Sequence, residues 1–253
     1  MVTAIIQARM GSTRLPGKVM MKINDEPMLY YVIKQVTSSK KISNIVIATT
    51  YLPEDDIIEK YGHELGYTVF RGEPNDVLDR YYQCAKNYNL KTIVRVTSDD
   101  PLIDPFVIDK CIEKFQNSHF DYVSNSISKK NQSWIPSLNG FPYGIAVEVF
   151  NFLSLFSAWE NSTNLLEREH ISPYFIKNPN VFKLSSISNH DDFSHIRVTV
   201  DYPEDFDFVK SILTYYGKNE IITIEKIVSF VEKNPELLKL NNKFLFNEFF
   251  KLQ

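Results

Sequence analysis

The sequence predicts an α/β fold with a mostly parallel central sheet that helices cover on both faces. Short apolar runs rich in β-branched residues alternate with helical patterns through the first half of the chain. Continuously apolar strands of this kind are typical of parallel sheets buried on both sides. The length of 253 residues suits one large domain or two small ones and allows a substantial core, and we see no linker, repeat or low-complexity segment.

The first half is expected to contain four strands and four helices in alternation. Pro53 and the acids after it mark a helix start, and Gly66 marks the end of that helix. Asp76 and Asp104 are N-cap candidates. The expected strands are Val2–Gln7, Asn44–Thr49, Thr68–Phe70 and Thr92–Thr97, and the expected helices are Met28–Val36, Pro53–Leu65, Asp76–Asn89 and Pro105–Gln116.

The second half is less regular. Residues 125–143 are polar but contain Trp134 and Pro136, which predicts a loop or a protruding hairpin. Phe246, Phe249 and Phe250 are spaced as one helical face, which predicts docking on the body or on a partner subunit. The expected strands are Phe120–Ser124, Ile145–Phe150, Val181–Ser186 and Ile196–Val200, and the expected helices are Leu165–Ile176, Pro203–Tyr215 and Thr223–Glu232.

Composition excludes several classes of protein. A net charge of −3 gives no overall basic field to attract nucleic acid. No apolar run approaches the roughly 20 residues that span a bilayer, and the first residues lack the features of a signal peptide. Cys84 and Cys111 are the only cysteines, which fits a reducing compartment without disulfides or a cysteine-rich metal site. We therefore expect a cytoplasmic protein without membrane insertion.

The strongest functional signal is the loop after the first strand, Gln7-Ala8-Arg9-Met10-Gly11-Ser12-Thr13-Arg14-Leu15-Pro16-Gly17-Lys18. It combines three cations, two glycines and two hydroxyl side chains. Glycines let backbone N–H groups approach an anion closely, and the cations neutralise a polyphosphate. The spacing is neither that of a P-loop nor Gly-x-Gly-x-x-Gly. The loop predicts a phosphate site, and a solvated basic loop is the alternative.

Acids follow two predicted strands at positions where a metal could bind. Asp99 and Asp100 follow one strand, and Asp201 follows Ile196–Val200. Because parallel strands deliver their carboxyl ends to one edge, Asp99 and Asp201 are expected to share one Mg²⁺ beside the basic loop. Asp100 in place of Asp99 is an alternative, and Asp201 is equally compatible with a loop or cap role. Asp104 is better explained as a helix cap.

Other polar residues have both a functional and a structural interpretation. Arg71 ends a strand at the same edge, and Asp79 and Arg80 lie in the next helical turn, where they could hold base or ribose or be surface charges. Glu148 lies in an apolar strand, where a bare charge is costly, so it should have a cation partner or face the site. His170 is either an acid–base candidate or a structural histidine.

Together these motifs resemble the cytidylyltransferase family that includes acylneuraminate and 3-deoxy-manno-octulosonate cytidylyltransferases. The likeness is strongest to the spore coat polysaccharide biosynthesis F-type branch, and it covers Val2–Val209. Where that branch usually has Thr-Gly-Asp-Cys-Pro, this chain has Thr97-Ser98-Asp99-Asp100-Pro101. The segments that carry the resemblance are residues 6–18, Arg71-Gly72, Asp76-Val-Leu-Asp79-Arg80-Tyr, Glu167-Arg168-Glu169-His170 and Val198-Thr-Val-Asp201-Tyr-Pro-Glu-Asp205.

The resemblance implies a Rossmann-like α/β/α nucleotide-diphospho-sugar transferase fold in a single domain, 1–253. Residues 1–124 would form the nucleotide-binding half, 125–143 a projecting dimerisation segment, and 144–253 the acceptor-side half with the C-terminal helices. The implied activity is Mg²⁺-dependent coupling of CTP to an acidic sugar, or to a phosphorylated or phosphonate acceptor, with release of pyrophosphate. Such a reaction would serve surface polysaccharide or glycoconjugate biosynthesis, in a homodimer.

The resemblance also implies a role for individual residues. The implied catalytic residues are Arg14, Lys18, Asp99 and Asp201, of which Asp99 and Asp201 would hold the metal. The implied acceptor-side residues are Glu148, Arg168 and His170. The implied nucleotide-binding residues are Ala8, Arg9, Gly11, Ser12, Arg14, Lys18, Arg71, Asp79, Arg80 and Asp99.

Two other classes of protein remain open at this point. A glycosyltransferase of related fold would take a nucleotide sugar, but such enzymes commonly carry Asp-x-Asp, and Asp99-Asp100-Pro101-Leu102 is not that pattern. A glycosyltransferase also has no need of a site for free pyrophosphate, which the basic loop suggests. A non-catalytic nucleotide-binding subunit is the second alternative, which the intact phosphate and metal candidates disfavour.

Overall fold

A computed structural model describes residues 1–245, in which a seven-stranded sheet forms the centre of the molecule. The neighbouring strands β1, β4, β5 and β6 are all parallel, as are β7 and β11. The mostly parallel α/β fold that the sequence predicts is therefore confirmed. In spatial order the strands are β11 (Leu184–Ser186), β7 (Tyr122–Ser124), β10 (Glu148–Asn151), β6 (Thr92–Thr97), β1 (Val2–Gln7), β4 (Asn44–Thr50) and β5 (Thr68–Gly72).

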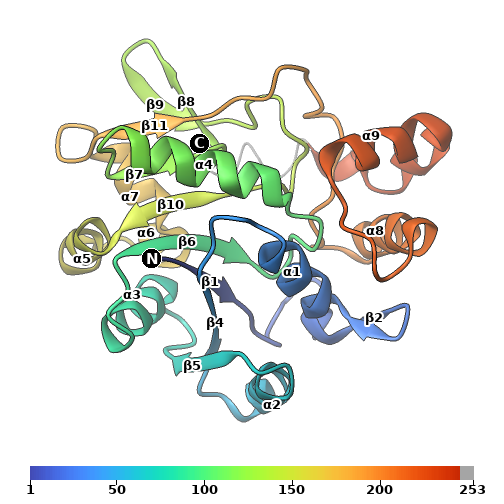
Figure 1. Cartoon of the computed structure of the whole chain (residues 1–253), viewed down its shortest axis with the longest axis horizontal. Coiled ribbons are helices and arrows are strands. Elements are labelled where there is room, and N and C mark those ends of the chain that lie inside the picture. The colour runs from blue at the N-terminus through green and yellow to red at the C-terminus, as the bar shows by residue number, and fades with distance from the viewer. Residues whose placement is uncertain (246–253) are drawn as a thin grey trace.

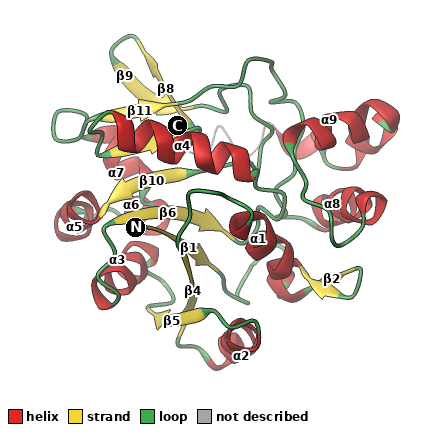
Figure 2. Ribbon diagram, viewed as in Figure 1, coloured by secondary structure: helices red, strands yellow, loops and turns green. Residues whose placement is uncertain are grey.

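Helices cover both faces of the sheet (Figures 1 and 2). One face packs against α1 (Met28–Thr37), α2 (Asp56–Glu64), α4 (Pro105–Asn117), α8 (Pro203–Tyr216) and α9 (Ile224–Lys233). The other packs against α3 (Val77–Asn87), α5 (Phe152–Asn161) and α7 (Ser172–Lys177), with α6 (Leu165–His170) directly before α7. No helix of residues 1–245 is both long and apolar enough to cross a membrane.

The strands divide their side chains between two hydrophobic cores. In β1, Ala4 and Ile6 belong to the core under α1 and α4, whereas Ile5 belongs to the core under α3 and α5. Successive side chains of a strand point to opposite faces, so a continuous apolar run is needed when both faces are covered. The apolar strands of the first half are therefore explained by burial on both sides.

The predicted helix starts in the first half have the expected local chemistry. The Asp76 carboxylate accepts a hydrogen bond from Asp79 N, and Asp104 accepts bonds from Phe106 N and Val107 N. Such bonds satisfy donors that a helix leaves unpaired in its first turn. Gly66 has a φ of +80° directly after the helix that it ends. These positions agree with the expected boundaries to within a few residues.

The strand β10 runs antiparallel between β6 and β7, which places two charged side chains side by side. In this register Glu148 lies opposite Arg95 on β6 and opposite Ser124 on β7. Directly opposed residues of an antiparallel pair have side chains close enough to interact. The cation partner that the sequence predicted for Glu148 is therefore supplied by the neighbouring strand.

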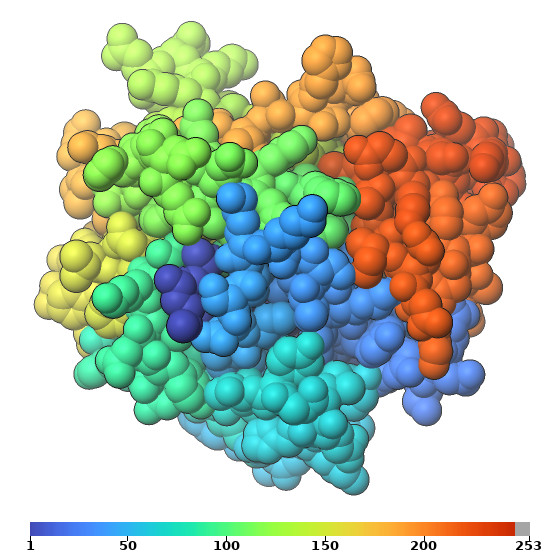
Figure 3. Space-filling view, in the orientation of Figure 1, coloured from blue at the N-terminus to red at the C-terminus, as the bar shows by residue number. Residues whose placement is uncertain are grey.

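Residues 125–143 include a hairpin that projects from the body. The strands β8 (Ile127–Lys130) and β9 (Ser133–Pro136) pair antiparallel across Asn131 and Gln132, both in the left-handed region. Figure 3 shows this hairpin as a protrusion at the upper left. The protruding hairpin is confirmed, and its role in dimer formation stays a prediction.

Three expectations about the second half are wrong or incomplete. Residues 196–200 are extended but form no strand of the sheet, with only an isolated bridge between Tyr143 and Arg197. The predicted helix Leu165–Ile176 is two helices, α6 and α7, broken at Ile171 where φ is +61°. Helix α5 was not predicted. Phe246, Phe249 and Phe250 lie outside the described residues.

Candidate active site

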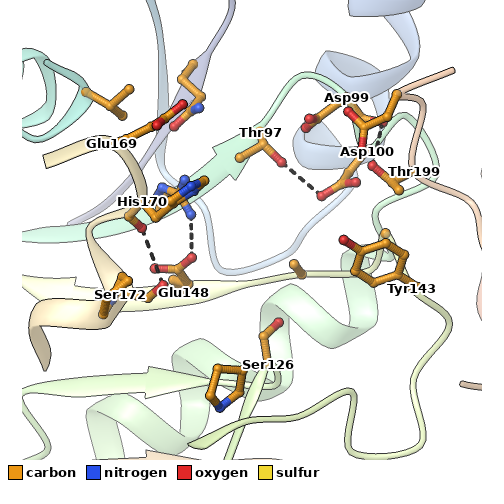
Figure 4. Close-up of a pocket in the computed structure, with 18 of the residues that line it drawn as sticks. Thr97, Asp99, Asp100, Ser126, Tyr143, Glu148, Glu169, His170, Ser172 and Thr199 are labelled. Atoms are coloured by element: carbon orange, nitrogen blue, oxygen red, sulfur yellow. Dashed lines mark hydrogen bonds and ion pairs between the residues drawn. The ribbon is translucent and has the colours of Figure 1, made fainter. Parts of the chain in front are cut away.

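A cavity of about 1030 Å³ lies beyond the carboxyl ends of β1 and β6, where ligands bind in parallel sheets. Figure 4 shows its labelled residues in two groups, with Asp99, Asp100 and Thr199 at one end and Glu148 and His170 at the other. Among the residues that the sequence predicted, those lining the cavity are Ala8, Arg9, Gly11, Ser12, Arg14, Lys18, Arg80, Asp99, Glu148, His170 and Asp201.

The basic loop after β1 is folded back on itself and lines one side of the cavity. Gly17 has a φ of +70° and donates a hydrogen bond to Met10 O at 3.0 Å. Met10 N in turn donates to the buried Asp55 carboxylate at 2.6 Å. Arg9 Nη1 donates to Pro74 O at 3.2 Å. These contacts fix the loop, so its cations and N–H groups are held in place before any ligand arrives.

Lys18 lies between the two predicted metal-binding acids. Its Nζ is 2.9 Å from Asp201 Oδ1, 3.4 Å from Asp99 Oδ2 and 2.6 Å from Val200 O. Burial alone would lower the pKa of this ammonium, but the charges of Asp99 and Asp201 outweigh burial and raise the pKa. The point where the two carboxylates meet therefore already accommodates a positive charge.

Asp201 is held from both sides. Arg14 Nη2 lies 2.9 Å from Asp201 Oδ1, and Arg197 Nη2 lies 3.3 Å from Asp201 Oδ2. The meeting of Asp201 with Asp99 was predicted from parallel strands, and that reason is wrong because residues 196–200 are not a strand. Instead Val200 N donates to Asp99 O at 2.8 Å, which ties the irregular segment to the loop after β6.

Asp99 and Asp100 differ in surroundings although they are adjacent. The Asp100 carboxylate is buried and accepts a hydrogen bond from Thr97 Oγ1 at 2.9 Å. Burial, together with the charge of Asp99, raises the pKa of Asp100 well above its ordinary value. Asp99 instead faces Lys18. Ser98 is not among the described residues with positive φ, so replacing the family's glycine there leaves the loop unstrained.

The far end of the cavity contains a buried ion pair, Arg95 with Glu148. The buried Tyr122, on β7 beside Glu148, also lines this end. Burial, followed by the charge of Arg95, lowers the pKa of His170 below its usual 6.5. The sequence motifs assign no role to Arg95. The available signal was a charged residue within an apolar strand, and the same signal singled out Glu148.

The base of the hairpin shapes the wall of the cavity, which the sequence did not reveal. Asn125 donates from Nδ2 to Ile145 O and accepts from Val147 N at 2.8 Å. These bonds hold the segment before β10 against the end of β7. Trp134 lines the same cavity from β9. The sequence shows that Trp134 lies in a polar segment, but only tertiary packing shows that it lines the cavity.

Three predicted site residues are not among those that line the cavity in the described part of the chain. Arg71 pairs with Asp56 and Glu59 of α2. Asp79 accepts from Trp159 Nε1 at 2.8 Å, and Arg168 pairs with Asp76 at 2.6 Å. Each of the three makes contacts that join neighbouring helices and loops, so their contacts within the chain are structural.

The fold of this chain is shared with nucleotidyltransferases of known structure. The solved structure of CMP:2-keto-3-deoxy-manno-octonic acid synthetase complexed with CTP superposes with a TM-score of 0.65, covering 85% of this chain and 98% of that one. At 14% sequence identity that likeness is one of fold. The cytidylyltransferase family profile matches residues 3–244, and the chain belongs to this family of enzymes.

Two relatives are similar over nearly their full length. The spore coat polysaccharide biosynthesis protein SpsF of Bacillus subtilis is 30% identical over 245 residues, which cover 92% of this chain and 94% of that protein. A solved cytidylyltransferase from Leptospira borgpetersenii is 34% identical, has a TM-score of 0.83, and covers 94% of this chain and 96% of that one. The predicted resemblance to the family is therefore confirmed.

Proposed function

We propose that the enzyme transfers a cytidylyl group from CTP to an acidic sugar, or to a phosphorylated or phosphonate acceptor, and releases pyrophosphate. The observation that carries the proposal is the joint position of the basic loop and two carboxylates at one end of a cavity. The other end of that cavity, around Arg95 and Glu148, leaves room for a second substrate. The similarity to SpsF, which is named for spore coat polysaccharide biosynthesis, supports an acceptor destined for a surface polysaccharide or glycoconjugate.

In this proposal an acceptor oxygen attacks the α-phosphorus of CTP while the bond to the β-phosphate oxygen breaks. The loop residues Arg9, Arg14 and Lys18 bind the triphosphate and neutralise charge on the departing pyrophosphate. The fixed loop holds the nucleotide in line with the acceptor, which removes much of the entropic cost of the reaction. His170, whose pKa is lowered by burial and by the charge of Arg95, lines the cavity near Glu148 and is our candidate to accept the proton of an acceptor hydroxyl.

Asp99 and Asp201 fit a Mg²⁺ ion. Their carboxylates meet at a point that already holds the Lys18 ammonium, and oxygen is the donor that Mg²⁺ prefers. One or two carboxylates plus phosphates and waters make up its usual ligands. When bound, the metal would supply charge stabilisation at the phosphates. Arg71, Asp79 and Arg168 are proposed to support the site through their contacts within the chain.

A screen of nucleotides and acceptors tests the proposal. Each NTP is incubated with Mg²⁺ and a panel of acidic sugars and phosphorylated or phosphonate acceptors, and pyrophosphate release is measured. We expect release with CTP that depends on the acceptor and is abolished in Asp201→Asn. Release of a nucleoside diphosphate when a nucleotide sugar replaces the NTP would contradict the proposal and favour a glycosyltransferase. Binding of CTP without turnover of any acceptor would favour a non-catalytic subunit.

A further inference from the structure

The two oxygens of the Asp201 carboxylate have different partners. Oδ1 contacts the Lys18 ammonium and the Arg14 guanidinium, both of which line the cavity. Oδ2 contacts Arg197 Nη2, and Arg197 is completely buried. One oxygen is therefore directed to the ligand site and the other to the interior. The direction of Asp201 depends on what holds Arg197.

Arg197 is held by a second acid that the reaction does not use. Its Nε and Nη2 donate to Asp205 Oδ1 and Oδ2 at 2.8 and 2.9 Å, in a bidentate pair with no solvent exposure on either side chain. The Tyr143 ring lies 4.9 Å from the guanidinium carbon. Bidentate pairs fix both the position and the plane of a guanidinium. Arg197 therefore has little freedom to follow Asp201 if Asp201 rotates.

Asp205 also fixes the backbone at Asp201. Its Oδ2 accepts hydrogen bonds from Asp201 N at 3.0 Å and from Tyr202 N at 3.1 Å. The same carboxylate that orients Arg197 thus also sets the position from which the Asp201 side chain starts. Asp205 therefore fixes the backbone of Asp201 directly and its Oδ2 atom through Arg197.

The buried Asn241, which lies later in the chain, contacts both Arg197 and Asp205. Its Nδ2 donates to Asp205 Oδ1 and to Arg197 O, each at 3.0 Å. Asn241 lies between the short 3₁₀ helices Pro235–Leu240 and Asn242–Phe244, and it is 1% exposed. This amide carries no charge, so its removal loosens the pair without leaving a buried ion unpaired.

We propose that Arg197, Asp205 and Asn241 are positioning residues that act through Asp201, and that they direct its Oδ1 to the divalent cation. The inference rests on the proposed function, because it takes Asp201 as a metal ligand. Groups that orient a metal ligand typically change metal affinity or activity by roughly 10–100-fold when removed. A residue needed only for packing would lower stability and leave metal affinity unchanged.

The test measures Mn²⁺ binding in the presence of CTP and without acceptor, from the electron paramagnetic resonance signal of free Mn²⁺. We expect Asn241→Ala to weaken Mn²⁺ binding by about tenfold, and Asp205→Asn to weaken it further. The control is Lys243→Ala, which removes an exposed pair with Glu204 in the same segment and should leave Mn²⁺ binding unchanged. Thermal unfolding checks that each variant is folded.

Double variants separate the possible outcomes. If Asn241 acts through Asp201, Asn241→Ala adds nothing to the loss of Mn²⁺ affinity in Asp201→Asn. A lower melting temperature with unchanged Mn²⁺ binding in both Asn241→Ala and Asp205→Asn would overturn the inference and leave the proposed function standing. Unchanged Mn²⁺ binding in Asp201→Asn would overturn the metal assignment itself, and this inference with it.

Discussion

Adjacent residues of one loop have different surroundings at the site. Asp99 faces the Lys18 ammonium, whereas Asp100 is buried on Thr97 with a raised pKa. A raised pKa means that the surroundings favour the uncharged form, which is unsuited to holding a cation. The geometry thus favours Asp99 over Asp100 as the metal ligand.

Asparagine substitutions of four acids test this assignment. Asp99→Asn and Asp201→Asn keep the shape and remove one charge each, so each should reduce turnover by at least ~10²-fold. The double variant should lose little more, because groups that act as one unit are not additive. Asp100→Asn and Asp104→Asn are matched controls and should remain within a few-fold of wild type. Steady-state rates decide, and near wild-type turnover in Asp201→Asn would contradict the shared-metal proposal.

His170 predicts a dependence of stability on pH. Its pKa in the folded protein is below the 6.5 of the unfolded chain, so the unfolded chain binds more protons between the two values. The corresponding contribution to stability is present above pH 6.5 and is lost as the pH falls through the folded pKa. Urea unfolding between pH 7.5 and 5 should show wild type losing stability relative to His170→Gln. Parallel curves for the two proteins would contradict the lowered pKa.

The sequence shows which charged residues belong to a motif, but it does not show whether their side chains point into the cavity. Arg80 and Arg71 both belong to quoted motifs, yet Arg80 lines the cavity whereas Arg71 turns to acids on α2. Arg95 lines the cavity although no motif argument assigned it a role. A long side chain reaches several partners from one backbone position, and only tertiary packing selects among them. Short loops with glycine and clustered cations are more predictable, because their chemistry is local.

At the scale of elements, propensity predicted an extended backbone correctly but not its partners. Residues 196–200 are rich in β-branched side chains and buried, as in a strand. Their neighbours are Tyr143 and the loop after β6, neither of which offers a strand edge. β-propensity reports fit to a buried, extended surface and says little about what pairs with it. Residues 196–200, which are buried but pair with no strand of the sheet, were therefore predicted to be a strand.

Two helix errors have local causes that were visible in the sequence. Pro173 lies in the first turn of α7, and a proline inside a helix removes a hydrogen bond and clashes with the preceding turn. It explains why the chain breaks at Ile171. Helix α5 is apolar on several sides, with Leu153 exposed and Leu155 buried, so its sequence lacks a clear helical face. Asn151, which caps it, was the remaining signal.

Gly144 joins the cavity wall to the segment that carries Asp201. Its φ is +110°, and a Cβ there would lie 2.3 Å from Thr199 N. Gly144→Ala should therefore destabilise the protein by about 2 kcal/mol or more and reduce turnover, since Thr199 is two residues from Asp201. Denaturant unfolding and steady-state rates measure the two effects.

Gly66 supplies the matched control for Gly144. It also has a positive φ, +80°, but a Cβ there would meet no atom within 4 Å. Gly66→Ala should cost only the backbone strain, about 1–2 kcal/mol, and leave turnover unchanged. Equal effects of the two substitutions on turnover would show that the contact between Gly144 and Thr199 has no bearing on the site.

At the scale of the whole molecule, the projecting hairpin predicts association. Trp134 and Ile135 are only partly buried within one chain, and isolated hairpins are marginal in water. We expect sedimentation at micromolar concentration to report a homodimer, and replacement of residues 128–135 by a short glycine-containing turn to give a monomer. An exposed substitution away from the hairpin, Lys60→Ala, should leave the dimer intact. A wild-type protein that sediments as a monomer would contradict the expectation.

Much of the overall architecture follows from the sequence because strand and helix alternate with clear local signals in the first half. The antiparallel insertion of β10 does not follow, because direction depends on how residues 125–147 return across the sheet. Glu148 was still interpreted correctly, since a charge in an apolar strand needs a partner whatever the direction of that strand. The cost of burying an unpaired charge thus predicted a contact of this strand, although the direction of the strand was not predicted.

The sheet separates two cores, and residues of both cores line the cavity. Ala8 and Val19 pack on the side of α1 and α4, whereas Tyr122 and Ile127 pack on the side of α3 and α5. Substitutions in one core repack that side without passing through the sheet. For an enzyme of the proposed function, one copy after a gene duplication could therefore change the part of its cavity that rests on one core while the other core stays as it was.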